Sequence, residues 1–163
     1  GLKKMSSNLI LATKVVKQLT KSDKTLALAE SITGGGLGMA ITEVSGSSKV
    51  FAGAIVAYSD IAKIKLLEVP KRLITKHTAV SEEVAKAMAL NARELFKADF
   101  AISTTGVAGP GKAYGKSAGS VWIAIASRRE CFAIELSLSG NRATVRNSTI
   151  ESALAAFSRI IYP

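Results

Sequence analysis

The chain has 163 residues, of which 48% are hydrophobic, and this size suits one domain with a packed core. No apolar run reaches the roughly 20 residues that cross a bilayer, and none near the start resembles a signal peptide, so we expect a soluble, cytoplasmic protein without a membrane partner. The net charge of +10 is scattered and lacks interleaved aromatic residues, which argues against nucleic acid and leaves an anionic small molecule as a candidate.

Cysteine and histidine usage narrows the possible chemistry. One cysteine and one histidine cannot build a disulfide framework or a Cys/His metal site, so we expect no metal and no cofactor. Cys131 lies in the apolar segment CFAIEL and is expected in the core. A Ser-His-Asp triad would need His77, which lies in an apparent loop and better fits a turn or surface role. A serine nucleophile here would therefore take a lysine as its base.

The hydrophobic pattern predicts five helices and five strands in one domain that spans residues 1–163. We expect residues 1–7 to lie outside the folded part, with Met5 as the native first residue. The order of elements predicts a mixed, mostly parallel five-stranded sheet with helices on both faces. In chain order the elements are helix 8–20, strand 25–29, helix 35–44, strand 50–59, helix 60–69, helix 82–96 capped by Ser81, strand 99–105, strands 121–127 and 131–139, and helix 141–160.

Glycines gather in two segments that each follow a predicted strand. Ligands bind at the carboxyl ends of strands in open α/β sheets, so both segments can face one crevice. Either segment alone could be a tight turn, but two at one edge favour a site. Nine of the thirteen glycines belong to these segments: Gly34, Gly35, Gly36 and Gly38, then Gly106, Gly109, Gly111, Gly115 and Gly119.

In the first segment, AESITGGG, the chain leaves a strand, turns through Ser31 and begins a helix near Gly35. This arrangement is similar to a nucleophile elbow without its G-x-S-x-G pattern. Backbone N–H groups at the helix start would then serve an oxyanion or a phosphate. Spacing alone fits a helix cap at Ser31 equally well, and Thr33 is also a candidate cap.

The second segment, TTGVAGPGKAYGKSAG, contains G-x-x-x-x-G-K at Gly106 to Lys112, but Ala113 replaces the Ser or Thr that binds Mg²⁺ in a P-loop. The segment also leads into a strand rather than a helix. A nucleoside triphosphatase is therefore not expected, although a phosphate cradle of another geometry is still open.

Six ordered blocks of the sequence closely resemble the CinA C-terminal domain family. They are AESITGG, SGSSKVFAGAIVAYSDIAKIKLLEV, HTAVSEEVAKAMA, TTGVAGPG, GSVWIAIA and SGNRATVR, and they run from about Asn8 to the C-terminus. That family includes bacterial nicotinamide-mononucleotide amidases. The resemblance implies a three-layer α/β/α fold, a homodimer, and hydrolysis of the nucleotide's carboxamide to nicotinate mononucleotide and ammonia.

By position, the resemblance assigns the catalytic serine to Ser31 and its tyrosine and lysine partners to Tyr58 and Lys63. As a base, Lys63 needs a pKa well below the ordinary value of about 10.4. Without the resemblance, Tyr58 reads as a half-buried strand aromatic. The candidate substrate contacts are Thr33, Gly34, Gly35, Thr105, Gly106, Gly109, Gly111, Arg142 and Arg146.

Arg142 and Arg146 are four residues apart at the start of the last helix, hence on one face, where they would bind a phosphate monoester. Spacing alone fits a surface pair equally well. The chain departs from the family at Ile32, where Cys is common, and at Asn141, where Asp would orient Arg142. The GPGKAYGKSAG loop also departs, which puts substrate fit in doubt.

Three hypotheses follow, in order of preference. The first is an amidase for nicotinamide mononucleotide with Ser31 as nucleophile and Lys63 as base. The second is an amidase for another small carboxamide, given the altered loop. The third is a non-catalytic module that binds a partner protein or DNA, in keeping with the family's competence and damage-inducible name.

Overall fold

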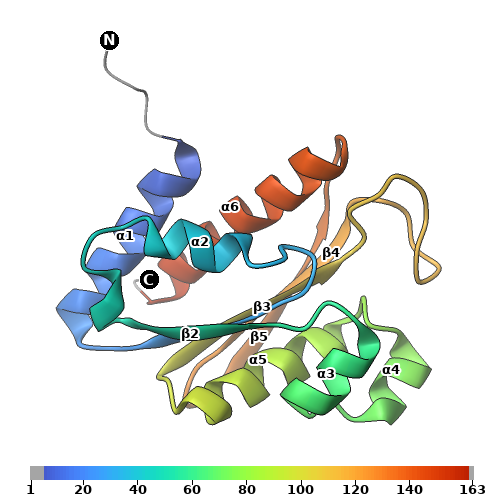
Figure 1. The fold of residues 1–163 in the computed structure, drawn as a ribbon, viewed down its shortest axis with the longest axis horizontal. Coiled ribbons are helices and arrows are strands. Elements are labelled where there is room, and N and C mark those ends of the chain that lie inside the picture. Colours follow the sequence, from blue (N-terminus) through green and yellow to red (C-terminus); the bar gives the residue numbers. More distant parts are fainter. Residues whose placement is uncertain (1–5, 162–163) are drawn as a thin grey trace.

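The computed structural model describes residues 6–161, which fold into a five-stranded sheet with helices on both faces (Figure 1). The strand order is β2-β1-β3-β4-β5. β1 pairs in parallel with β2 and β3, whereas β4 is antiparallel to both β3 and β5, so four of the five strands run in one direction. The strands are β1 (Leu26–Glu30), β2 (Phe51–Val56), β3 (Phe100–Gly106), β4 (Ser120–Ala126) and β5 (Cys131–Ser137).

Two groups of helices complete the three layers that the sequence predicts. One face of the sheet carries α1 (Ser7–Ser22), α2 (Gly36–Thr42) and α6 (Arg142–Ile161), and the other carries α3 (Asp60–Leu67), α4 (Lys71–His77) and α5 (Glu82–Phe96) (Figure 1). A short 3₁₀ helix, Ser47–Lys49, precedes β2. None of the helices in residues 6–161 is long and apolar enough to cross a membrane.

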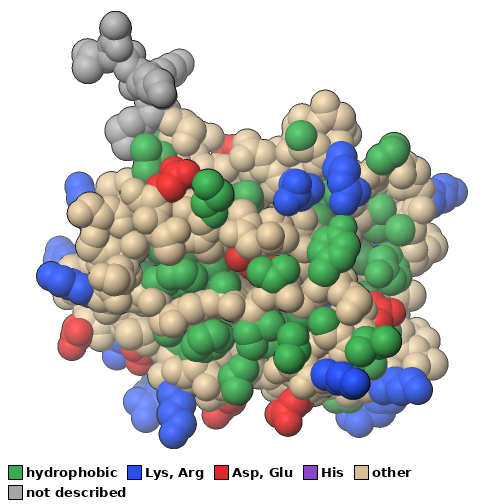
Figure 2. All heavy atoms as spheres, viewed as in Figure 1, with side chains coloured by type: hydrophobic (Ala, Val, Ile, Leu, Met, Phe, Trp, Pro, Cys, Tyr) green, Lys and Arg blue, Asp and Glu red, His purple; other side chains and the backbone are tan. Residues whose placement is uncertain are grey.

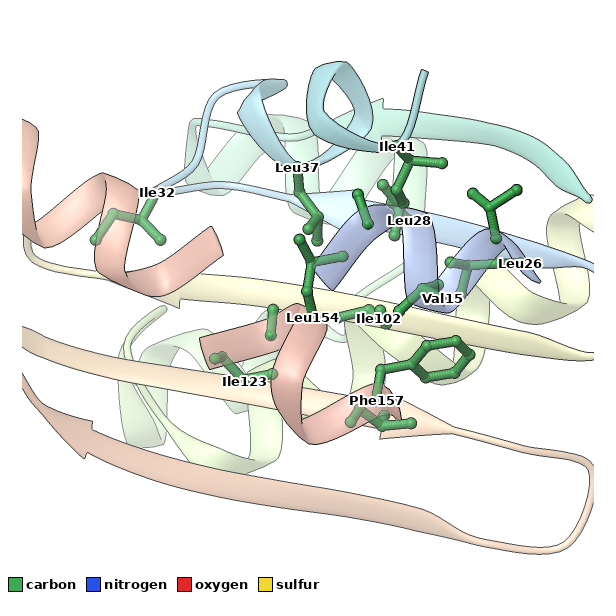
Figure 3. Packing of buried hydrophobic residues seen from close by; sticks show 14 of the residues in the cluster. Val15, Leu26, Leu28, Ile32, Leu37, Ile41, Ile102, Ile123, Leu154 and Phe157 are labelled. Carbon is green, nitrogen blue, oxygen red and sulfur yellow. The ribbon is translucent and has the colours of Figure 1, made fainter. Parts of the chain in front are cut away.

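The larger core cluster lies between the sheet and the α1, α2 and α6 layer (Figure 3). Leu28 and Ile102, from the central strands, meet Leu37 of α2, and Leu154 and Phe157 of α6 in this layer. Strands β1 and β3 are buried along nearly their whole length, as expected for central strands covered on both faces. Burial of the central strands fixes their carboxyl ends, where the site lies.

Several local predictions need correction. Residues 6 and 7 belong to the fold, because Ser6 caps α1 and Ser7 begins it; residues 1–5 and the proposed Met5 start lie outside the described residues. His77 is not in a loop but ends α4, a helix that the pattern did not predict because its seven residues bury no side chain fully. Cys131 is half-buried at the edge of the sheet rather than in the core, and partial burial raises the pKa of its thiol.

Candidate active site

A cavity of about 170 Å³ opens at the carboxyl ends of β1 and β3, where both glycine-rich segments meet. Its lining includes Ser31, Lys63 and Tyr58, which the family resemblance implies as the catalytic group. The same cavity is lined by Arg142 and by four of the predicted substrate contacts in the second segment, Thr105, Gly106, Gly109 and Gly111. The cavity thus brings together residues that follow β1 and β2 with residues of α3, β3 and α6.

The turn that carries Ser31 is organised by Glu30, a fully buried carboxylate at the end of β1. One carboxylate oxygen of Glu30 accepts hydrogen bonds from the Thr33 hydroxyl (2.6 Å) and from the N–H groups of Gly35 (3.2 Å) and Leu37 (2.8 Å). The other accepts from the Gly38 N–H at 3.0 Å. Glu30 thus satisfies the free donors at the start of α2 and complements its dipole.

This arrangement corrects two predictions about the turn. Thr33 does not cap α2: the N-cap position is Gly35, at φ 99°, and its N–H donates to the Glu30 carboxylate. Ser31 does not cap the helix either. Its N–H donates to the Thr104 carbonyl at 3.0 Å, which ties the serine to the neighbouring strand β3 and leaves its hydroxyl facing the cavity.

Lys63 of α3 is 1% exposed and points its ammonium nitrogen at Ser31. Nζ lies 2.8 Å from Ser31 Oγ, 2.9 Å from the Ala57 carbonyl oxygen and 3.2 Å from that of Tyr58. Burial lowers the pKa of Lys63 to about 8, against a smaller opposing effect of Asp60. Lys63, which the family resemblance assigns as the base, therefore lies in contact with Ser31 and has a lowered pKa.

Tyr58 and Arg142 form the outer part of the cavity. The Tyr58 side chain is 58% exposed, and its hydroxyl accepts a hydrogen bond from Arg142 Nη2 at 3.0 Å. Arg142 Nη1 donates to the Gly109 carbonyl at 2.6 Å, so this arginine links α6 to the second glycine segment. Asn141 accepts the Thr144 N–H at 2.9 Å and caps α6, a role that needs no negative charge beside Arg142.

Four predicted substrate contacts lie outside the cavity lining. The Thr33 side chain is buried and bonded to Glu30, while Gly34 and Gly35 form the turn beneath it. Arg146 donates from Nε to the Ile32 carbonyl (3.2 Å) and from Nη2 to that of Thr33 (3.3 Å). These residues therefore support the Ser31 turn rather than the cavity wall.

The sequence predicts that backbone N–H groups of the glycine turn are available to an oxyanion, but the glycine donors of this turn are already bonded within the protein. Gly34 donates to the Ser31 carbonyl and Gly36 to that of Thr33, and Glu30 takes the Gly35 donor. Within the described chain, the N–H of Ile32 has no acceptor, and Ile32 lines the cavity. The Ile32 N–H is therefore the candidate oxyanion donor next to Ser31, because it holds the position of the donor that follows the nucleophile in an elbow.

Sequence reasoning missed Glu30 and Thr104. Thr104 is fully buried, and its hydroxyl lies 2.8 Å from that of Thr33, which joins the turn to β3. One feature of the sequence could have identified Glu30: it is a single carboxylate at the end of the otherwise apolar strand LALAE, shortly before the glycine run. His77, by contrast, pairs with Glu83 at 3.6 Å outside the cavity, so it cannot act on Ser31.

Comparison with known proteins agrees with this architecture. The family model of the CinA C-terminal domain matches residues 8–161. A CinA-like protein of Geobacter sp. (strain M21) is 47% identical over 137 residues, which are 83% of this chain and 33% of the relative. A CinA-like protein of Synechococcus sp. (strain CC9902) is 49% identical over 122 residues, 74% of this chain and 29% of the relative. The chain thus spans about a third of the length of the curated relatives that it matches.

Solved structures show the same fold over nearly the whole chain. The competence damage-inducible protein A of Klebsiella pneumoniae superposes with a TM-score of 0.92 and 32% identity, and covers 94% of this chain and 96% of its own. The competence/damage inducible protein CihA of Agrobacterium tumefaciens gives a TM-score of 0.93 and 30% identity, with full coverage of both chains. With the fold, the ordered sequence blocks and the family model in agreement, the chain belongs to the CinA C-terminal domain family.

Proposed function

We propose that the chain is an amidohydrolase that converts nicotinamide mononucleotide to nicotinate mononucleotide and ammonia, with Ser31 as nucleophile. The observation that carries this proposal is the buried contact of 2.8 Å between Lys63 Nζ and Ser31 Oγ at the base of the cavity. A nucleophile within hydrogen-bond reach of a base is the arrangement that covalent acyl transfer needs. The nucleotide itself is what the family resemblance adds.

The three acceptors around Lys63 favour its role as a base. When the amine is neutral, its two N–H bonds can donate to the carbonyls of Ala57 and Tyr58. The remaining lone pair then faces Ser31 Oγ and can accept the hydroxyl proton. With a pKa of about 8, Lys63 is neutral in a minority of the molecules near pH 7, and in these molecules it can act as the base.

The proposed reaction has two steps, acylation of Ser31 and hydrolysis of the acyl-enzyme. Ser31 Oγ bonds to the carboxamide carbon while its proton passes to Lys63, and the oxyanion accepts from the Ile32 N–H. The protonated Lys63 then gives its proton to the leaving nitrogen, the C–N bond breaks, and ammonia departs. In deacylation, water attacks the acyl carbon while Lys63 takes one of its protons. The ester C–O bond then breaks, Lys63 passes that proton to Ser31 Oγ, and the nicotinate carboxyl group leaves and ionises in solution.

The charge of the cavity supports an anionic substrate. Apart from Lys63, the cations Lys112 and Arg142 line it, and no Asp or Glu side chain is among its lining residues in the described chain. Arginine in particular suits the oxygens of a phosphate monoester. Arg142 is already held by Tyr58 and Gly109, so little side-chain entropy is lost when it binds phosphate.

The decisive experiment measures ammonia release from nicotinamide mononucleotide by the purified chain and by its Ser31→Ala variant. We expect turnover by the wild type and a loss of at least about 10³-fold in the variant, because the nucleophile is removed. Ser45→Ala, at an exposed serine away from the cavity, is the matched control and should keep full activity. Full activity in Ser31→Ala would refute the nucleophile.

The same assay separates the alternatives. Turnover of other carboxamides, but not of the nucleotide, would favour an amidase of different specificity. No amidase activity, together with DNA retention that falls steeply with salt, would favour a binding module. Lys14, Lys17 and Lys21 form an exposed line along α1 that continues to Lys24, but no aromatic residue interleaves with this line to stack on bases.

A further inference from the structure

The loop between β3 and β4 closes one side of the cavity with a tight turn. The Ala113 N–H donates to the Lys116 carbonyl at 3.0 Å, and the Lys116 N–H donates back to the Ala113 carbonyl at 2.9 Å. The two residues at its tip, Tyr114 and Gly115, have φ angles of 53° and 71°. Two left-handed residues are typical of a type I′ turn, and glycine or asparagine normally occupies both positions.

The turn is also anchored to the opposite wall of the cavity. Lys116 Nζ donates to the Val80 carbonyl at 2.7 Å, and both Val80 and Tyr114 line the cavity. A bulky aromatic residue at positive φ is uncommon and is found where the surrounding structure holds it for a purpose. The turn therefore holds the Tyr114 ring at the cavity against the preference of its own backbone.

Tyr114 has the features of a ligand-contacting side chain. It is 44% exposed, and within residues 6–161 no hydrogen bond holds its hydroxyl. Partial burial raises the pKa of the Tyr114 phenol, and the nearby carboxyl group of Asp60 and phenol of Tyr58 raise it further. The Tyr114 phenol is therefore neutral. Tyr58 is fixed by Arg142 and is likewise exposed. Two aromatic side chains thus border the same opening.

We propose that Tyr114, together with Tyr58, holds the planar aromatic ring of the substrate at the cavity mouth and thereby determines which ring-bearing carboxamides are accepted. This inference rests on the proposed amidase function. Aromatic faces attract flat rings, and they attract a positively charged pyridinium ring more strongly than a neutral one. Arg142 and Lys112, which line the same cavity, are then left for the phosphate.

The test compares Tyr114→Ala and Tyr114→Phe by their KM and kcat for nicotinamide mononucleotide. We expect Tyr114→Ala to raise KM about five- to tenfold with kcat within about twofold, because a stacking contact is lost before the chemical step. Tyr114→Phe keeps the ring and should restore the wild-type KM. Phe132→Ala, at an exposed aromatic residue on β5, is the matched control and should change neither constant.

A ring-free ligand distinguishes a lost contact from a damaged loop. Ribose 5-phosphate carries the sugar phosphate without the ring, so its inhibition constant should be the same in the wild type and in Tyr114→Ala. An unchanged KM in Tyr114→Ala, or an equal weakening of ribose 5-phosphate, overturns the proposal.

If the proposed amidase function is wrong, the wild type releases no ammonia from nicotinamide mononucleotide. Calorimetric titration with nicotinate mononucleotide then tests Tyr114 without turnover. Binding that weakens about five- to tenfold in Tyr114→Ala supports the ring contact. Binding that is unchanged in the variant, or absent in the wild type, overturns it.

Discussion

Lys63 is a buried lysine whose environment affects both the stability of the fold and its own pKa. A lysine that is 1% exposed and has no carboxylate within ion-pair distance in the described chain carries a desolvation penalty whenever it is protonated. Its three acceptors, one from Ser31 and two from backbone carbonyls, reduce that penalty and fix the nitrogen. Burial lowers the pKa of Lys63, so the same penalty that disfavours the charged form favours the neutral form that the proposed reaction needs.

This balance predicts the pH dependence of the reaction. The free base must be neutral, so kcat/KM for nicotinamide mononucleotide should rise with pH and level off above the Lys63 pKa of about 8. Asp60 raises that pKa, so Asp60→Asn should move the profile to lower pH. A pH titration of kcat/KM measures both effects. Glu68→Gln, at an exposed residue that ends the same helix, should leave the profile in place; a shift to higher pH in Asp60→Asn would contradict the assignment.

At the scale of elements, the Glu30 carboxylate couples β1 to α2. It accepts one hydroxyl and three backbone donors, and the turn between the two elements carries Ser31. Gly38 leaves room for this carboxylate, because a Cβ at that position would lie only 3.3 Å from a Glu30 oxygen. The nucleophile is therefore positioned by the junction of a strand and a helix rather than by its own side-chain contacts alone.

Glu30→Gln tests this junction. The amide replaces an acceptor oxygen with an NH₂ group that must face N–H donors, so we expect a loss of about 1–3 kcal/mol in the free energy of unfolding. Amidase activity should fall as well, since the Ser31 turn loosens. Urea denaturation followed by circular dichroism gives the first quantity. Glu43→Gln, at the exposed end of α2, is the control, and equal stability of the two variants would show that Glu30 does not hold the turn.

At the scale of the whole molecule, the β2 edge of the sheet is open. β1 is the only strand neighbour of β2 in residues 6–161, and the outward positions Ala52, Ala54 and Val56 are exposed and uncharged. Figure 2 shows hydrophobic side chains gathered on the face that includes β2 and α3. An uncharged exposed edge can pair with another chain, whereas the β5 edge carries Glu135. The β2 edge is therefore the expected contact of the homodimer that the family resemblance implies.

A charge on this edge should separate the protomers. Light scattering coupled to size-exclusion chromatography should give the dimer mass for the wild type and the monomer mass for Ala54→Lys, because a lysine on the edge strand disfavours pairing. Ser137→Lys, at an exposed position on β5, should remain dimeric. A monomeric wild type, or a dimeric Ala54→Lys, would exclude this contact.

Sequence periodicity predicted the sheet well, with all five strands and five of the six α-helices near their observed positions. It missed α4 because a seven-residue helix without a fully buried side chain shows no apolar period. It placed Cys131 in the core because alternation marks a strand but does not say whether the strand lies at an edge. Strand order, which decides this, depends on pairings between residues far apart in the chain.

For the site, the sequence by itself determined the chemical groups: a serine on a glycine turn, the absence of a usable histidine, a lysine in its place, and arginines at the start of α6. Only the tertiary structure decided which of these groups meet and what each one contacts. The fold buries Lys63 and brings its Nζ into contact with Ser31 Oγ, although the two residues are 32 positions apart in the chain. The Glu30 carboxylate accepts hydrogen bonds from the backbone N–H groups of the turn, which are then not available to a substrate. The fold also separates Arg142, which lines the cavity, from Arg146, which supports the turn. The reason is physical: hydrogen-bond partners and desolvation depend on which distant segments fold together, and local sequence does not contain that information.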